Sequence, residues 1–313
     1  MTTLTYSVVL MCYNQADYVT DAVQALLAQD CEPVEILLSD DYSSDDTFAR
    51  LEQAVAGYDG PHHVVLNRNT HNLGVNAHIL RCYDLSQGDV IIATSGDDIC
   101  LPNRIARTIE VFEREKPLLA FSQARVETLQ GQDMPRAYQK ATFYRNRSAQ
   151  AASTSMQLYL GATCAWHKDL FRKYGSIQSK DCFEDLIFGF RAALEERVAF
   201  IDEDLVRYRL GAGLTNTQRQ SETEEQFTSR RLLELRREVA VLQQRQADAT
   251  VFGLPADDPI QKGMRRMMGD RNMRQAYISA GPLALARVGW RRPLKALGLW
   301  ISEAKRRRKA VSG

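Results

Sequence analysis

The sequence of 313 residues has no apolar run that approaches the roughly 18 consecutive residues a transmembrane helix needs. It has almost no net charge either, since 40 basic and 39 acidic residues leave a formal charge of +1, which argues against a nucleic-acid-binding protein. The N-terminus carries neither the basic nor the apolar region of a signal peptide. We therefore expect a cytoplasmic protein.

Metal-binding cysteine motifs are absent too. The six cysteines are scattered without a CxxC motif or a Cys/His pair, a pattern that favours reduced core thiols over disulfides or zinc. Hydrophobic residues make up 44% of the chain and charged residues 25%, so the chain can bury a large core. These values predict a soluble, globular protein with one large domain or two smaller ones.

What the sequence does contain is a regular alternation of strand and helix patterns in its first part. Short apolar, β-branched runs alternate with segments whose apolar residues recur at helical spacing. The runs predict strands at 6–12, 34–38, 63–66 and 90–93, and the spacing predicts helices at 18–27, 45–56, 75–85 and 104–114. Four such units indicate an α/β fold with a mostly parallel, Rossmann-like sheet flanked by helices.

Polar side chains follow every predicted strand. Tyr13 and Asn14 follow the first, residues 39–45 the second, residues 67–74 the third, and Asp97 and Asp98 the fourth. In parallel sheets ligands collect at this edge. Carboxylates can accept hydrogen bonds from a base or ribose, Tyr13 can pack on a base, and the adjacent aspartates can hold a divalent ion. The set suits a nucleotide diphosphate.

Each of these loops also has a purely structural interpretation. Ser44 can cap a helix, while Asp45 and Asp46 can complement its dipole. Asn14 and Asn72 suit turns, and Gly74 can supply a positive φ.

Four motifs in register carry a resemblance to a known family. They are Ser7-Val8-Val9 leading to Tyr13-Asn14, Ser39-Asp40-Asp41, Asn72-Leu73-Gly74-Val75, and Gly96-Asp97-Asp98 with Leu101-Pro102-Asn103-Arg104. Their order and spacing resemble the family 2 glycosyltransferases of the GT-A fold over about residues 5–215. The resemblance implies that Asp41 contacts the nucleoside base with Asp40 beside it. It also implies that Asp98 is the main ligand of Mn²⁺ or Mg²⁺, with Asp97 nearer the sugar or ribose.

The second half of the chain adds a candidate base. Glu184 and Asp185 open an amphipathic helix pattern and resemble the family's Glu-Asp motif, in which the aspartate is the general base toward the acceptor hydroxyl. The alternative is that both acids only favour the helix N-terminus. Trp166, which ends a predicted strand, is a candidate for the acceptor pocket, with a core position as the alternative.

The sequence departs from the family pattern at two places. Ile79-Leu80 stand where many members carry Arg-Asn, which puts phosphate contacts from that helix in doubt. Gly211 stands where many members carry a histidine, so a third metal ligand from that position cannot be assumed.

The expected domains are a GT-A domain at 1–215 and a helical region at 216–313. The first divides into a nucleotide-sugar-binding half, 1–122, and an acceptor-binding half, 123–215. A charged helix is predicted at 221–247, with an apolar stripe of Phe227, Leu232, Leu235, Val239 and Leu242. Apolar and basic residues then alternate over 283–309, which indicates either a helix on a membrane surface or an oligomerisation helix with a basic end.

Together these features predict an inverting, metal-dependent glycosyltransferase. It would move a sugar from a nucleotide-diphosphate sugar to a hydroxyl of a saccharide or lipid-linked saccharide, in cell-surface polysaccharide or lipid-linked glycan assembly. We expect it in the cytoplasm or peripherally at the inner face of the cell membrane. The alternatives are a nucleotidylyltransferase, which should carry a Gly-rich basic loop after the first strand, and a catalytically inactive nucleotide-sugar-binding homologue.

Overall fold

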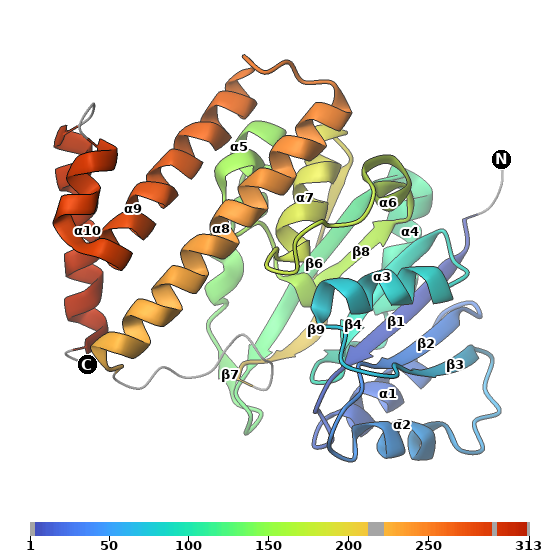
Figure 1. Ribbon diagram of the computed structural model, residues 1–313. Coiled ribbons are helices and arrows are strands. Elements are labelled where there is room, and N and C mark those ends of the chain that lie inside the picture. The colour runs from blue at the N-terminus through green and yellow to red at the C-terminus, as the bar shows by residue number, and fades with distance from the viewer. Residues whose placement is uncertain (1–3, 212–221, 290–292, 312–313) are drawn as a thin grey trace.

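The computed structural model describes residues 4–211, 222–289 and 293–311, and the side chains of 282–296 lie outside its description. A twisted sheet with helices on both faces forms one side of the molecule, and long helices form the other (Figure 1). The predicted domain boundary at 215/216 lies outside the described residues.

The first part of the chain follows the predicted alternation closely. All four predicted strands and all four predicted helices are present, with ends that differ by a few residues at most. The elements are β1 (Tyr6–Cys12), α1 (Val19–Leu27), β2 (Glu35–Asp40), α2 (Thr47–Val55), β3 (His63–Arg68), α3 (Val75–Leu85), β4 (Val90–Ser95), β5 (Ile99–Cys100) and α4 (Arg104–Glu115).

The next part completes the sheet. Its elements are β6 (Leu119–Glu127), β7 (Asp133–Met134), three short 3₁₀ turns at 137–140, 142–144 and 161–163, α5 (Ala149–Thr154), β8 (Cys164–His167), α6 (Asp169–Tyr174), α7 (Glu184–Leu194) and β9 (Val198–Arg209). The strand order in the described sheet is β3-β2-β1-β4-β8-β6-β9-β5, and β7 pairs with β6. The first four strands in this order are parallel, whereas β8 runs antiparallel between β4 and β6. The fold class is therefore the expected mostly parallel sheet.

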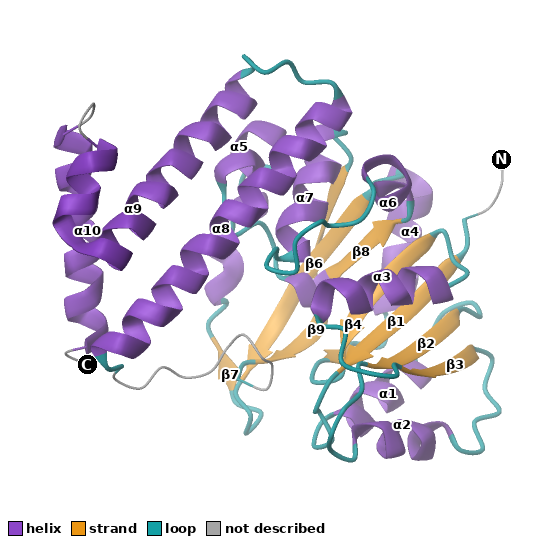
Figure 2. Ribbon diagram, viewed as in Figure 1, coloured by secondary structure: helices purple, strands orange, loops and turns teal. Residues whose placement is uncertain are grey.

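Alternate residues of the strands pack into two cores, one on each face of the sheet. Val8 and Leu10 of β1 face the core beneath α1, α2 and α4, whereas Val9 faces the core shared with α3, α6 and α7. This is the period-two pattern of a strand buried on both faces. Figure 2 shows the helices on either side of the sheet.

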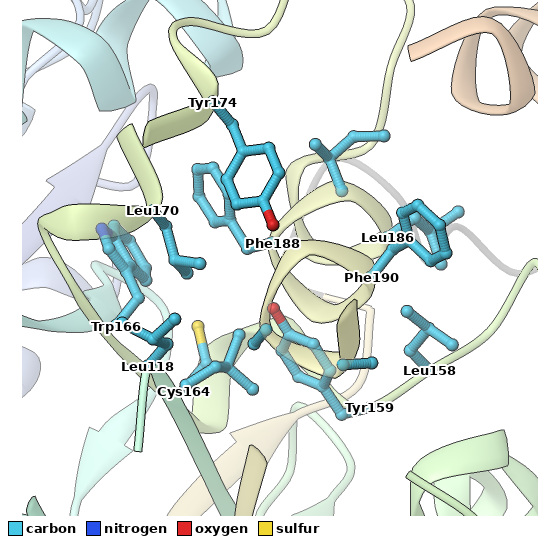
Figure 3. Close-up of a cluster of buried hydrophobic side chains, with 14 of the residues drawn as sticks. Leu118, Leu158, Tyr159, Cys164, Trp166, Leu170, Tyr174, Leu186, Phe188 and Phe190 are labelled. Atoms are coloured by element: carbon cyan, nitrogen blue, oxygen red, sulfur yellow. The ribbon is translucent and has the colours of Figure 1, made fainter. Parts of the chain in front are cut away.

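The core shared with α3, α6 and α7, the second core from here on, is rich in aromatic residues (Figure 3). Trp166 and Tyr159 lie on the sheet side of this core, and Phe188 and Phe190 extend from α7. The rings of Trp166 and Phe188 have centroids 5.2 Å apart. The Trp166 side chain is only 2% exposed. Trp166 therefore takes the core position rather than the pocket position.

The pairing of β6 with β9 changes register midway. Ser122 pairs with Ile201, Gln123 with Asp204 and Ala124 with Val206. Strand β9 thus has three more residues than β6 over this stretch, as in successive β-bulges. The end of β9 turns toward β5, which pairs with it antiparallel.

The described residues of the C-terminal part form the helices α8 (Glu224–Phe252), α9 (Pro259–Gly289) and α10 (Pro293–Val311). Thr223 begins α8 with a capping box to Gln226, and Gly253, with φ 104°, ends it in the left-handed conformation. Gly281, with φ 75°, interrupts α9. The basic and apolar stretch at 283–309, which was predicted as one helix, is divided between the end of α9 and α10, and part of it lies outside the described residues.

Helix α8 shares the second core with the sheet domain. Val241, Leu242 and Ala249 belong to the same buried cluster as Val9 and Phe188. Of the predicted apolar stripe, Phe227, Leu235 and Leu242 are buried, whereas Leu232 and Val239 are only partly buried. Polar side chains take the remaining buried positions of the helix, namely Arg231, Gln244, Arg245 and Asp248.

One ion pair joins α8 to α7 inside this core. The Arg191 guanidinium donates to both carboxylate oxygens of Asp248, at 2.8 and 3.1 Å, and to the carbonyl of Gly175 at 2.8 Å. Both side chains are almost fully buried. Water cannot replace either partner there, so the loss of one leaves a charge uncompensated.

We expect Asp248→Ala to lower the free energy of unfolding by about 3–5 kcal/mol because it leaves Arg191 buried and unpaired. Urea denaturation followed by circular dichroism measures this change. The matched control is Asp133→Ala, which removes the solvent-exposed bidentate pair with Arg125 and should leave the midpoint nearly unchanged. Equal midpoints for both variants would contradict the importance of the buried pair.

Candidate functional site

The carboxyl ends of β3, β2, β1 and β4 lie next to one another and bring the predicted polar loops to one edge of the sheet. Asp41, just after β2, links two of these loops. Its Oδ1 accepts hydrogen bonds from Asn69 Nδ2 at 2.8 Å and from the Leu73 backbone N–H at 2.9 Å, and its Oδ2 accepts from the Gly74 N–H at 2.9 Å. Gly74 has φ 77°, which favours glycine. Asp41 therefore fixes the loop before α3.

Asp40 and Asn14 hold the loop between β2 and α2. Asp40 has no exposed surface and accepts hydrogen bonds from the Ser43 backbone N–H, at 3.0 Å, and from its hydroxyl. The Asn14 N–H donates to Ser43 Oγ at 2.8 Å, and Asn14 Oδ1 accepts from the Ser44 N–H at 2.9 Å. Tyr13 lies partly buried beside this network.

Two candidates for helix and turn roles can now be placed. Ser44 does not cap α2: the N-cap residue is Asp46, whose side chain makes no capping hydrogen bond, and Asp45 Oδ1 accepts from the Thr47 N–H at 3.0 Å. Asn72 is exposed at the tip of the next loop.

Asp97 and Asp98 follow β4 and are nearly inaccessible to solvent, at 4% and 2% exposure. Asp97 Oδ1 accepts from the Ser95 hydroxyl, and Asp98 Oδ1 accepts from the Arg209 backbone N–H at 3.1 Å. Burial and the neighbouring Asp97 raise the pKa of Asp98 well above its usual range, although Arg104 and Arg209 oppose that rise. Two buried carboxylates in this position repel each other, and a cation would relieve the repulsion.

The donor set fits a divalent ion that substrate phosphates help to hold. Within the described ranges, no three His, Cys, Asp or Glu residues gather into a metal site. Mg²⁺ is commonly held by one or two carboxylates together with phosphate oxygens rather than by a closed protein cage. Asp97 and Asp98 match that requirement. Gly211 occupies the position at which many family members carry a histidine, and glycine has no side chain that could be a third ligand.

Glu184 and Asp185 occupy the first turn of α7. Asp185 Oδ1 accepts from the Leu186 N–H at 2.7 Å. Burial raises the pKa of Asp185 to about 6, and burial together with repulsion from Asp185 raises the pKa of Glu184 to about 7. Gly161 lies directly against the pair, since a Cβ added there would be 3.8 Å from the Asp185 Cβ and from a Glu184 carboxylate oxygen. Both residues are partly exposed.

Two side chains outside the predicted set of site residues join the segments beside this pair to the polar edge of the sheet. Asn76, in the first turn of α3, donates to the carbonyls of Ser179 and Cys182 at 3.1 and 2.9 Å. The fully buried Arg104 donates to the carbonyls of Ala93, on β4, and Ala162, beside Gly161. The position of Arg104 after Leu-Pro-Asn was a signal in the sequence, but its target carbonyls lie 11 and 58 residues away.

Arg209 brings a positive charge close to Asp98. Its guanidinium donates to Asp21 at 3.1 Å and lies over the Tyr18 ring, with 5.5 Å to the centroid. Together with Arg125, Glu127, Leu129, Gly131 and Arg207 it lines a pocket of about 310 Å³. Arg209 thus both lines this pocket and, through its backbone N–H, contacts Asp98.

Solved structures resemble the chain over nearly its whole length. TarS of S. aureus (residues 1–349), in complex with UDP-GlcNAc, matches with a TM-score of 0.59 at 15% sequence identity, over 97% of this chain and 92% of that one. The mannosyltransferase PcManGT of Pyrobaculum calidifontis, in complex with GDP-Man and Mn²⁺, matches with a TM-score of 0.56 at 14% identity, over 99% and 84%. These likenesses show the GT-A fold.

Sequence comparison identifies the family. EpsE of Bacillus subtilis (strain 168), which carries the name of a glycosyltransferase, is 27% identical over 110 residues. The match covers 35% of this chain and spans 39% of the length of EpsE. The model of the family described as "Glycosyl transferase family 2" matches residues 7–175, more than half of the chain. The chain belongs to glycosyl transferase family 2.

Proposed function

We propose that the protein is an inverting, metal-dependent glycosyltransferase that moves a sugar from a nucleotide-diphosphate sugar to an acceptor hydroxyl. The observation that carries the proposal is the pair of Glu184 and Asp185. These are partly exposed residues whose carboxyl groups have raised pKa values, and Asn76 and Arg104 join the segments beside them to the acidic edge of the sheet. A simple helix-dipole role would not require the connection to that edge.

Asp185 is the proposed general base. A base works best when its pKa lies near the pH at which it operates, and a pKa of about 6 leaves Asp185 ionised at neutral pH yet basic enough to accept a proton. Glu184, beside it, is proposed to contact the acceptor substrate. A single displacement, with the acceptor hydroxyl attacking opposite the leaving group, inverts the anomeric centre.

The edge of the sheet is the proposed donor site. Tyr13 and the loops held by Asp40, Asp41 and Asn14 form the nucleoside side, while Asn72 and Gly74 border it. Asp98, with Asp97 on the sugar side, would hold Mn²⁺ or Mg²⁺. That ion supplies charge stabilisation for the departing diphosphate. TarS with UDP-GlcNAc and PcManGT with GDP-Man and Mn²⁺ support a donor of this class.

A nucleotidylyltransferase is the less favoured alternative. It needs a Gly-rich basic loop after the first strand, and here Tyr13-Asn14-Gln15 follows β1. An inactive binding homologue is separated from an enzyme by donor hydrolysis without acceptor, since it should release no nucleotide diphosphate.

The proposed acceptor belongs to cell-surface polysaccharide or lipid-linked glycan assembly, and α10 supports a place at an anionic membrane. Leu297, Trp300 and Ile301 are 40–49% exposed and share one face of α10. Lys305 and Arg308 continue that face, while the single acid of α10, Glu303, is buried against Arg231 and Arg274. An apolar, basic and acid-free face suits anionic lipid. Among the described residues, no helix is long and apolar enough to span a membrane.

The first prediction concerns the base. Asp185→Asn should lower the transfer rate by about a hundredfold to ten-thousandfold, because the hydroxyl proton loses its acceptor. Nucleotide diphosphate release measures the rate, and NMR of the product should show the anomeric configuration opposite to that of the donor. The control is Asp169→Asn, a half-exposed acid in the first turn of α6, which should keep full activity. Unchanged transfer by Asp185→Asn would refute the assignment.

The second prediction concerns the metal. Chelation should abolish transfer, added Mn²⁺ or Mg²⁺ should restore it, and Asp98→Asn should lower the rate at saturating metal by about a hundredfold or more. Steady-state kinetics against metal concentration measures both effects. Asp202→Asn, an exposed acid of β9, is the control. Full activity in the chelated enzyme would contradict metal dependence.

The third prediction concerns α10. In flotation with vesicles, the protein should bind phosphatidylglycerol-containing membranes and not pure phosphatidylcholine, and Leu297→Ser should weaken binding. Leu233→Ser, an exposed leucine on α8, should not. If Leu297→Ser instead turns a dimer into a monomer in light scattering and leaves flotation unaltered, α10 is an oligomerisation helix.

A further inference from the structure

Arg245 of α8 is a fully buried cation, and no carboxylate of the described residues forms an ion pair with it. Its Nε and Nη2 donate to the carbonyl of Leu186 at 3.1 and 2.8 Å, and its Nη1 donates to the carbonyls of Ser153 and Ser155 at 3.2 and 2.7 Å. The nearby Asp248 is already paired with Arg191. The remaining acid that interacts with Arg245 most strongly is Asp185.

Leu186 connects the two groups. Its N–H donates to Asp185 Oδ1 at 2.7 Å, and its carbonyl accepts the two hydrogen bonds from Arg245. One residue of the first turn of α7 is therefore held at both ends, with the carboxylate on one side and the guanidinium on the other. A buried cation is stabilised by a nearby anion, and the anion is stabilised equally in return.

We propose that Arg245 is the positioning residue of the catalytic base: it fixes the first turn of α7 through Leu186 and keeps the Asp185 carboxylate ionised. The inference rests on the proposed role of Asp185. It assigns a part in the reaction to α8, a helix that lies beyond the residues matched by the family model.

The other groups around Asp185 do not take over this role. Glu184 is an acid and repels Asp185. Tyr159 is fully enclosed and its pKa is raised well above its usual range, while burial raises the pKa of Cys164 to about 12, so both stay neutral. Burial lowers the pKa of Arg245 to about 9, which still leaves it charged at neutral pH.

The test compares Arg245→Gln with Arg231→Gln. Both arginines are buried on α8, but Arg231 pairs with Glu303 of α10. Asp185 must be ionised to accept a proton, so the transfer rate falls as pH drops through its pKa. Without Arg245 the pKa of Asp185 should rise by about one unit, which costs about fivefold in rate at pH 6 and little at pH 8.5. Arg231→Gln should leave the acid limb, meaning the fall of the transfer rate toward low pH, at the same pH as in the wild type. An unmoved limb in Arg245→Gln would overturn the proposal.

A second measurement does not use activity. At pH 8, Arg245→Gln should lower the urea midpoint more in the wild-type background than in the Asp185→Asn background, because only the former loses a charge pair. Arg231→Gln should lower it equally in both. Equal losses for Arg245→Gln would refute the coupling and leave the base assignment intact, whereas an acid limb that survives in Asp185→Asn would refute the base assignment itself.

Arg245→Gln could fail to fold alone, and that outcome is informative too. If Asp185→Asn restores folding in the double variant, the charge pair is supported. If neither the single nor the double variant folds while Arg231→Gln does, Arg245 serves the structure only, and the proposal is overturned.

Discussion

Buried guanidinium groups that donate to backbone carbonyls hold the irregular parts of this molecule in place. Arg104, Arg191 and Arg245 are all fully buried, and each reaches carbonyls in segments outside the regular strands and helices. Such segments have no ladder to satisfy their polar groups, and an unsatisfied carbonyl in the interior is costly. The guanidinium of arginine has five N–H donors spread over a planar fork and can serve carbonyls in separate segments, whereas lysine has three donors on a single nitrogen. Arg104 and Arg245 in this way hold the carbonyls of Ala162 and Ser155, in the part of the chain whose Gly161 lies against Glu184 and Asp185.

How far the sequence could predict this structure depends on the distance between interacting residues. The strands and helices up to residue 115 were predicted well, because each is encoded by the spacing of its own apolar residues. Asp97, Asp98, Glu184 and Asp185 are candidates because they form adjacent pairs at the end or the start of an element, and their roles, which the family resemblance implies, stay predictions. The Asn76, Arg104 and Arg245 contacts were missed, since they join segments far apart in the chain. On α8, the sequence does not distinguish the buried Arg231, Arg245 and Asp248 from charged residues that face solvent.

The two acidic pairs of the site show how the same fold treats similar groups differently. Asp97 and Asp98 are almost completely enclosed, with Arg104 and Arg209 close by. Glu184 and Asp185 are partly exposed residues at a helix start, and Asp185 interacts with one buried cation, Arg245. The first environment favours a bound ion, and the second favours a group that exchanges protons. This difference in surroundings, rather than in residue type, separates the two proposed roles.

The register change between β6 and β9 has a consequence for the tolerance of this chain to insertions and deletions. Three extra residues in β9 bring the Arg209 N–H to Asp98, and the pleat reverses the direction of every side chain when one residue is lost. Residues 201–206 can therefore vary in identity more freely than in number. In evolution, a change of length in this stretch would have to be matched elsewhere in the strand pair, so relatives that differ in length here should also differ in how they complete the acidic edge.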